Sequence, residues 1–256
     1  MRYFIEIAYD GTPYHGWQRQ PNAVTVQEVL EKALTTLLRR DIQVTGAGRT
    51  DAGVHARQLF AHFDLDKLFD APACGQLTFR LNRLLPQSIA VKSVFQVDEE
   101  AHARFDATSR SYEYWLTPKK NPFLVDRALL VQWQLDFEAM NHAAEILLGR
   151  KDFKCFSRSK TDVKTYLCKI TEAQWKQVDG SYVFRVSADR FLRNMVRAIV
   201  GTLIEIGQGK KPVSEMQVII SARERSQAGA SVPAHGLYLM DITYPNTIYS
   251  TDGREQ

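Results

Sequence analysis

The chain is poor in cysteine: its 256 residues include only Cys74, Cys155 and Cys168. An odd number of widely spaced cysteines is a poor disulfide framework, and no two stand at metal-ligand spacing, so we expect three free thiols. Glycine (14) and proline (9) are too scarce for a collagen-like or low-complexity chain. No stretch approaches the roughly 18 uninterrupted apolar residues that a membrane-spanning helix requires. These absences favour a globular protein without disulfides.

The chain also lacks a strong excess of charge. Its 33 lysines and arginines against 29 acidic residues give a net charge of +4 and a pI near 8.9. This mildly basic balance permits a nucleic-acid partner without requiring one.

The first residues enter a strand-like alternation at once, instead of the basic, apolar and small-residue order of a secretory signal. We therefore expect a cytoplasmic protein.

Apolar periodicity predicts strands and helices that are interleaved in both halves of the chain, which is typical of α/β or α+β folds. Strands are expected over residues 3–9, 42–44, 59–63, 89–97, 112–116, 170–178, 182–188 and 237–244. Helices are expected over 25–37, 76–85, 136–148, 191–206 and 214–221, and residues 250–256 as a disordered tail. A charged interruption at 98–100 predicts two halves, residues 1–103 and 104–256.

The densest group of chemically useful residues lies in residues 46–56. Gly46, Gly48 and Gly53 permit a tight backbone that a ligand can approach closely, and Asp51 is the one carboxylate inside the segment. The alternative is a plain turn that Asp51 caps. A dinucleotide-binding fingerprint fails because Asp51 stands where a third glycine is needed, and a metal pair of Asp51 with His55 lacks a third ligand.

A second candidate is a basic segment near residue 194. If a helix covers it, spacings of three and four place Arg190, Arg193 and Arg197 on one side. Such a row is either a solvated basic face or a set of phosphate contacts with Arg197 turned inward to a carboxylate. Gly201, one turn beyond Arg197, would let another backbone pack closely.

Two tyrosines form the third candidate. On a strand, Tyr112 and Tyr114 share a face. They are either core side chains or an aromatic platform for a base that leaves its stack.

These motifs, taken in order, resemble the tRNA pseudouridine synthase A family over nearly the whole chain. Its signature resembles residues 48–55, which include Arg49, Asp51 and His55. Residues 9–12 and 16–18 resemble the family's opening, 102–105 with Arg110 and Tyr112 its middle, 191–197 with Gly201 its third motif, and 234–239 its closing strand. Residues 164–168 depart from the pattern, because no arginine stands there where many members carry one.

The resemblance implies two similar α/β halves with a central, mostly antiparallel sheet and a catalytic cleft between them. It implies a homodimer without metal or organic cofactor that converts uridine to pseudouridine at positions 38, 39 and 40 of tRNA. Asp51, Arg197 and Tyr112 are then the expected catalytic residues. The residues expected to contact substrate are Tyr112, Arg49, His55, Arg190, Arg193 and Leu237.

Two other functions stay open on the sequence. One is a tRNA-binding protein without catalysis, and the other is a pseudouridine synthase that acts on ribosomal or small nuclear RNA. The first predicts RNA binding that survives the loss of Asp51 and yields no product. The second predicts product in a different RNA.

Overall fold

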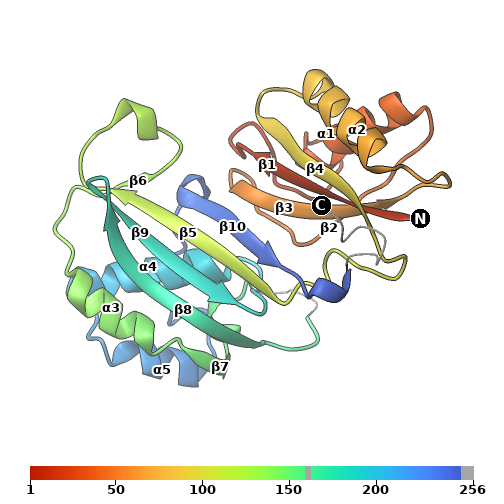
Figure 1. The fold of residues 1–256 in the computed structure, drawn as a ribbon. Helices are drawn as coiled ribbons and strands as arrows, with labels where there is room; N and C mark the ends of the chain where they lie inside the picture. Colours follow the sequence, from red (N-terminus) through yellow and green to blue (C-terminus); the bar gives the residue numbers. More distant parts are fainter. Residues whose placement is uncertain (159–162, 249–256) are drawn as a thin grey trace. The chain divides into compact units, whose positions relative to one another are not determined.

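The computed structural model describes residues 1–158 and 163–248, so the expectation for residues 250–256 lies outside the described part. It divides into two compact units (Figure 1). Unit 1 contains Met1–Thr108 and the residues from Leu239 on, and unit 2 contains Ser109–Tyr238. The sequence placed the expected division between residues 103 and 104, with residues 104–256 in one half, and here the chain from Leu239 on groups with the first unit.

Unit 1 is an antiparallel sheet with two helices on one face (Figure 1). Its elements are β1 (Arg2–Tyr9), α1 (Val26–Leu38), β2 (Thr45–Gly46), β3 (His55–Asp64), α2 (Ala71–Leu84), β4 (Ile89–Val97) and, from Leu239 on, β10 (Leu237–Thr243). β1 lies between β4 and β3, with Ile5 opposite Ala61, and β2 and β10 adjoin β3. Buried apolar side chains of β1 and α1, such as Phe4 and Leu30, form the core.

The helices of unit 1 begin where side chains cap them. Thr25 accepts a hydrogen bond from the backbone N–H of Glu28 at 3.4 Å, which confirms the expected start of α1. α2 begins five residues before the expected position. Asp70 accepts from the N–H of Ala73 at 2.9 Å, and Pro72 occupies the first turn, where no N–H is needed.

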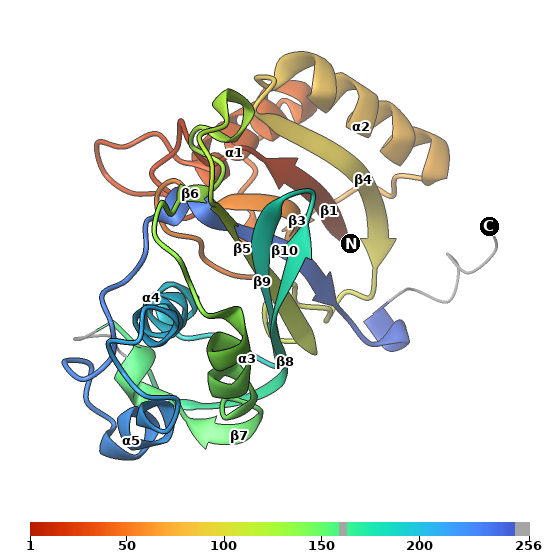
Figure 2. The same ribbon diagram turned by 90° about the vertical axis from the view of Figure 1, so that its left-hand side faces the viewer.

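In unit 2 the strands β5–β9–β8–β7 pair antiparallel in this order, β6 pairs with β5 in parallel, and helices pack against them (Figure 2). Its elements are β5 (Ser109–Thr117), β6 (Leu129–Leu130), α3 (Phe137–Glu145), β7 (Gly149–Asp152), β8 (Leu167–Val178), β9 (Ser181–Ala188), α4 (Met195–Gly207) and α5 (Glu215–Ala222). β8 and β9 turn at Asp179 and Gly180, both at positive φ, which confirms the expected hairpin. Both units therefore mix helices with mostly antiparallel strands.

The expected helix over 191–206 is wrong at its start. α4 begins at Met195, because Asn194 takes a left-handed conformation with φ of 67° that a helix cannot continue through. Its side-chain amide donates to the hydroxyl of Ser231 at 2.6 Å. Arg190 and Arg193 therefore precede the helix, and only Arg197 lies on it.

Candidate active site

Asp51 lies in a turn between β2 and β3 of unit 1, and its side chain is half-buried. Its neighbour Arg49 is exposed, whereas Thr50 is buried and shares a hydrogen bond of 2.9 Å with the hydroxyl of Tyr9. The backbone N–H of Val54 donates to the carbonyl of Asp51 at 3.2 Å. The turn thus presents one carboxylate from a backbone that is fixed on both sides.

The loop after β1 packs directly on this turn. Gly16 has a φ of +88°, and a Cβ at this position would overlap the carbonyl oxygen of Thr50 and lie 3.1 Å from the carbonyl carbon of Asp51. A Cβ on Gly11 would likewise overlap the carbonyl oxygen of Val54. The backbone N–H of Gly53 donates to the carbonyl of Tyr14 at 3.3 Å. Glycine is required at 11 and 16 because two backbones meet there without room for a side chain.

Trp17 closes the other side of the turn. Its side chain is only 1% exposed, and its backbone N–H donates to the carbonyl of Thr50 at 3.2 Å. A Cβ on Gly46 would collide with the indole ring. Trp17 therefore holds both the start of the glycine-rich segment and the residue before Asp51.

His55 begins β3 and is 3% exposed. Its Nδ1 accepts a hydrogen bond from the N–H of Gly11 at 3.1 Å and lies 3.1 Å from Oδ1 of Asp10. These contacts join the end of the turn to the loop after β1. They give His55 a part in holding the turn that the sequence motif alone did not indicate.

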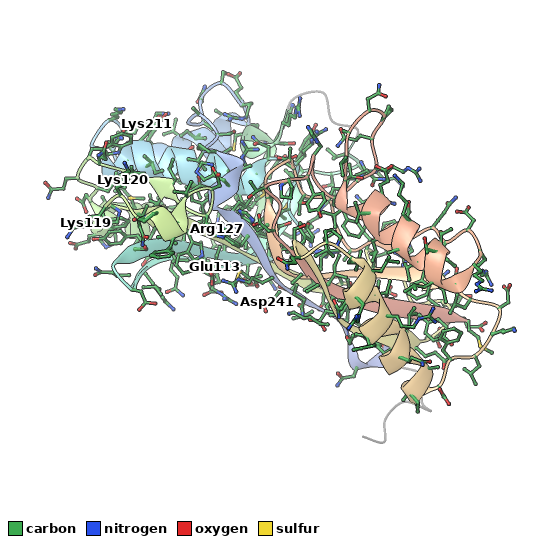
Figure 3. All side chains as sticks on the ribbon, turned by 90° about the horizontal axis from the view of Figure 1, so that it is seen from above. Glu113, Lys119, Lys120, Arg127, Lys211 and Asp241 are labelled. Carbon is green, nitrogen blue, oxygen red and sulfur yellow. The ribbon has the colours of Figure 1, made fainter. Side chains whose placement is uncertain are left out.

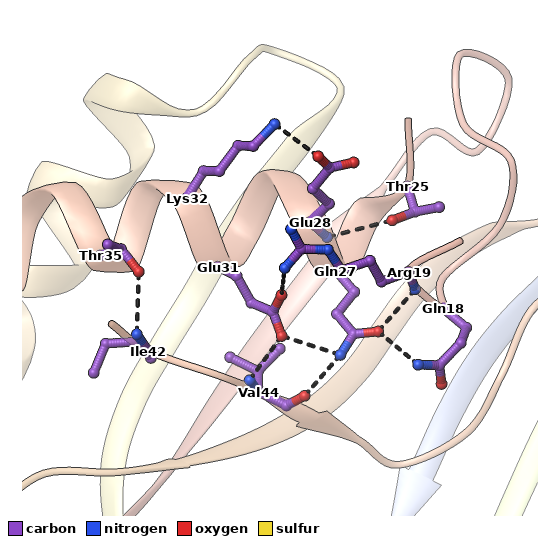
Figure 4. Close-up of polar contacts among 10 residues, drawn as sticks. All are labelled: Gln18, Arg19, Thr25, Gln27, Glu28, Glu31, Lys32, Thr35, Ile42 and Val44. Carbon is purple, nitrogen blue, oxygen red and sulfur yellow. Dashed lines mark hydrogen bonds and ion pairs between the residues drawn. The ribbon is translucent and has the colours of Figure 1, made fainter. Parts of the chain in front are cut away.

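A polar network on α1 holds both residues 42–44 and the loop after β1 (Figure 4). The buried carboxylate of Glu31 accepts hydrogen bonds from the N–H of Val44 at 3.1 Å and from the Gln27 amide at 3.1 Å. Gln27 also accepts from the N–H of Arg19 at 2.9 Å. Residues 42–44 are held by these side chains instead of a strand ladder, so the expected strand there is wrong; only Thr45–Gly46 pairs, with β3.

Tyr112 lies on β5 of unit 2, opposite Val186 of β9, and is half-buried. The ring of Phe191 meets it edge-on at a centroid distance of 5.1 Å. Tyr114 differs: it is fully buried, and its hydroxyl donates to the carbonyl of Pro233 at 2.9 Å. Burial raises the pKa of Tyr114 well above its ordinary value. Tyr114 is therefore a core residue, while Tyr112 is only partly buried.

Leu237 follows a short turn that packs against β5. It is 6% exposed, and a Cβ on its neighbour Gly236 would lie 2.8 Å from the ring of Tyr114. Leu237 is thus placed by the same strand that carries Tyr112.

Arg197 is half-buried in the first turn of α4. Its Nε donates to the carbonyl of Val232 at 2.7 Å, and the N–H of Val232 donates back to the carbonyl of Arg197 at 3.2 Å. One turn on, a Cβ on Gly201 would overlap the carbonyl of Ala230. The expected close approach of a second backbone at Gly201 is confirmed. It comes from residues 228–232, which no sequence pattern singled out.

The two remaining arginines lie in the segment between β9 and α4. Arg193 is exposed, and its carbonyl accepts from the N–H of Arg158 at 3.0 Å. Arg190 is half-buried and near Cys168, whose pKa burial raises to about 12. Because the segment is not helical, the expected row on one helix face is wrong, although both side chains remain on one short stretch of chain.

Among residues 1–158 and 163–248, no three histidine, cysteine or acidic side chains form a group that could hold a metal ion. Within the same ranges, no helix is long and apolar enough to cross a membrane. All three cysteines are buried and free, as expected.

Comparison with known proteins identifies the family of this chain. A family model described as tRNA pseudouridine synthase matches residues 6–106 and 143–245. A tRNA pseudouridine synthase A of Bacteroides thetaiotaomicron is 51% identical, and the match covers 100% of this chain and 95% of that protein. The protein of the same name from Porphyromonas gingivalis is also 51% identical, over 97% of this chain and 99% of its own. The chain belongs to the tRNA pseudouridine synthase family.

More distant similarities add little. A tRNA pseudouridine synthase A of Acetivibrio thermocellus is 41% identical, over 93% of this chain and 97% of that protein. The solved structure of a Cbf5-Nop10-Gar1 complex covers 78% of this chain and 54% of its own, at 11% identity and a TM-score of 0.32. That likeness is too low to establish a shared fold.

Proposed function

We propose that this protein converts uridine to pseudouridine at positions 38, 39 and 40 in the anticodon stem-loop of tRNA, with Asp51 as the nucleophile. The coarser activity, isomerisation of uridine in tRNA, follows from membership of the family. One observation carries the finer assignment: Asp51 is the one carboxylate of a turn whose backbone is held by Gly11, Gly16 and Trp17.

The chemistry suits such a carboxylate. Pseudouridine formation breaks the bond between N1 of uracil and C1′ of ribose, turns the base, and joins C5 to C1′. The product is an isomer of the substrate, so the balance needs no oxidant, group donor or water. An ionised carboxylate can attack the sugar or the ring, or accept the proton that C5 releases. We therefore propose that no metal or organic cofactor takes part.

Three further side chains complete the proposal. Arg197 is expected to stabilise the ionised form of Asp51, since a nearby guanidinium favours a charged carboxylate. Arg49, exposed beside Asp51, is expected to fill the space left by the flipped base. Tyr112 is expected to stack on the uracil or to relay the proton from C5, and Leu237 to contact the substrate near it. His55 acts as a positioning residue through its contact with Gly11.

Two wider properties belong to the same proposal. We further propose that the enzyme is cytoplasmic and acts as a homodimer, as the resemblance of its motifs to the tRNA pseudouridine synthase A family implies. Sedimentation of the purified protein over a range of concentrations tests the dimer.

The deciding experiment incubates the pure protein with unmodified tRNA and maps pseudouridine by position. Product at 38, 39 and 40 is expected from wild type, and none from Asp51→Asn or Asp51→Ala. Asp41→Asn is the matched control, because Asp41 is exposed and precedes the glycine-rich segment. Residual turnover above about one per cent in the Asp51 variants would remove Asp51 from the nucleophile role. Product only in ribosomal or small nuclear RNA would mean that those RNAs are the substrate instead of tRNA. Binding of tRNA without product would mean that the protein is a tRNA-binding protein without catalysis.

Arg190 and Arg193 are proposed as phosphate contacts. Replacing either with Ala should weaken tRNA binding and lower the slope of log K against log salt by about one unit for each contact. An unchanged slope in both variants would assign these side chains to solvent.

A further inference from the structure

The loop between β5 and β6, residues 118–128, turns apolar side chains outward. Phe123 is 85% exposed and Val125 is 61% exposed. Large apolar side chains that gather on one surface loop mark a site of interaction more often than a chance exposure. The loop begins after Thr117, which stands five positions beyond Tyr112 on β5, about 17 Å along the strand at its usual rise.

Hydrogen bonds fix the 118–128 loop although its tip is apolar. The N–H of Phe123 donates to the side chain of Asn121 at 2.9 Å, and the hydroxyl of Thr117 donates to the carbonyl of Lys119 at 2.8 Å. The hydroxyl of Tyr238 donates to the carbonyl of Arg127 at 2.8 Å. A loop fixed in this way loses little conformational entropy when a partner binds.

The charge of the loop indicates the partner. Lys119, Lys120 and Arg127 are exposed (Figure 3). Their three positive charges and the one negative charge of Asp126 give residues 118–128 a net charge of +2. Interfaces between proteins are depleted in lysine at their centres. Lysines beside an exposed aromatic ring are instead what single-stranded nucleic acid recognises, through phosphates and a stacked base.

We propose that the 118–128 loop is a second RNA contact, in which Phe123 stacks on an unpaired base and Lys119 and Lys120 contact backbone phosphates. The inference rests on the proposed function for its RNA, and it adds a contact on a loop that begins after Thr117, five positions along β5 from Tyr112. The loop then raises affinity for the whole tRNA without entering the chemistry.

The test measures tRNA affinity by filter binding at several salt concentrations, together with the single-turnover rate at saturating tRNA. Phe123→Leu should weaken binding about fivefold or more, the loss expected for one stacked base, while Phe123→Trp should bind like wild type. Lys119→Ala with Lys120→Ala should lower the salt slope by about 1.5. The saturated rate should stay unchanged in all of them.

Matched controls are Phe79→Leu, which removes an exposed ring of α2, and Lys176→Ala with Lys210→Ala, which removes two exposed charges of unit 2. Affinity and slope equal to those of the controls would overturn the inference. So would unchanged affinity with a changed sedimentation coefficient, because the loop would then bind a second copy of the chain.

Failure of the proposed function looks different. If wild type binds tRNA through the loop but forms no pseudouridine, the contact is supported and the proposed activity is refuted. If wild type forms pseudouridine and the loop variants bind unchanged, only the contact falls.

Discussion

Gly16→Ala tests whether the close packing of two loops sets the position of Asp51. A side chain at φ of +88° costs about 1 to 2 kcal/mol. The overlap of its Cβ with the carbonyl of Thr50 adds about 1 to 3 kcal/mol, as overpacking does. Relief of the overlap requires a shift on the order of 1 Å, because carbon contacts settle near 3.5 Å. The shift falls on the peptide that joins Thr50 to Asp51.

A misplacement of that size can lower a rate by about 100-fold. We therefore expect Gly16→Ala to reduce the single-turnover rate of pseudouridine formation by about two orders of magnitude, while the protein stays folded. The stability loss of about 2 to 5 kcal/mol is read from urea unfolding. The rate is read at saturating tRNA, so that weaker binding does not contribute.

Gly180→Ala is the matched control. Gly180 also has a positive φ, of +76°, but no atom lies within 4 Å of the Cβ that the substitution adds. It should lose about 1 to 2 kcal/mol of stability from backbone strain alone and keep its rate. If Gly16→Ala is folded and reacts within about threefold of wild type, the packing of these loops does not position the catalytic carboxylate.

Other expected outcomes concern Arg197 and His62. Arg197→Lys should lose most activity, because an ammonium lacks the two-pronged geometry of a guanidinium. Arg197→Met should lose more activity at low pH than at high pH. If the pH–rate profile of Arg197→Met equals that of wild type, Arg197 does not stabilise the ionised form of Asp51. His62 is 7% exposed and accepts the N–H of Ala103 on Nδ1 at 3.1 Å, and burial holds its pKa down to about 4 against an ordinary 6.5. The unfolded chain therefore takes up a proton that the folded chain resists, so stability should fall as pH drops from 6.5 towards 4, by at most about 3 kcal/mol. Urea midpoints against pH should lose this dependence in His62→Asn, whose amide oxygen can accept the same N–H, and keep it in the exposed control His142→Gln; equal curves for wild type and His62→Asn would count against this account.

Local chemistry determined several features from the sequence alone. Thr25 starts α1 and Asp179-Gly180 turns the hairpin of unit 2, because capping and positive φ depend on residues within a few positions. The segment around Asp51 could be singled out in the same way, since glycines and a carboxylate stand within one short stretch. Its expected role in catalysis stays a prediction.

Tertiary structure decided what depends on distant residues. The grouping of most of β10 with the first unit, and the start of α4 after Asn194 instead of at residue 191, follow from contacts with segments tens of residues away. Gly201 predicted a close approach, but only the fold shows that Ala230 makes it. The sequence listed His55 only as an expected substrate contact and gave no sign of its contact with Gly11. That contact exists because two loops far apart in the chain pack backbone to backbone. Periodicity carries no information about such partners, since they are selected by the packing of the whole unit.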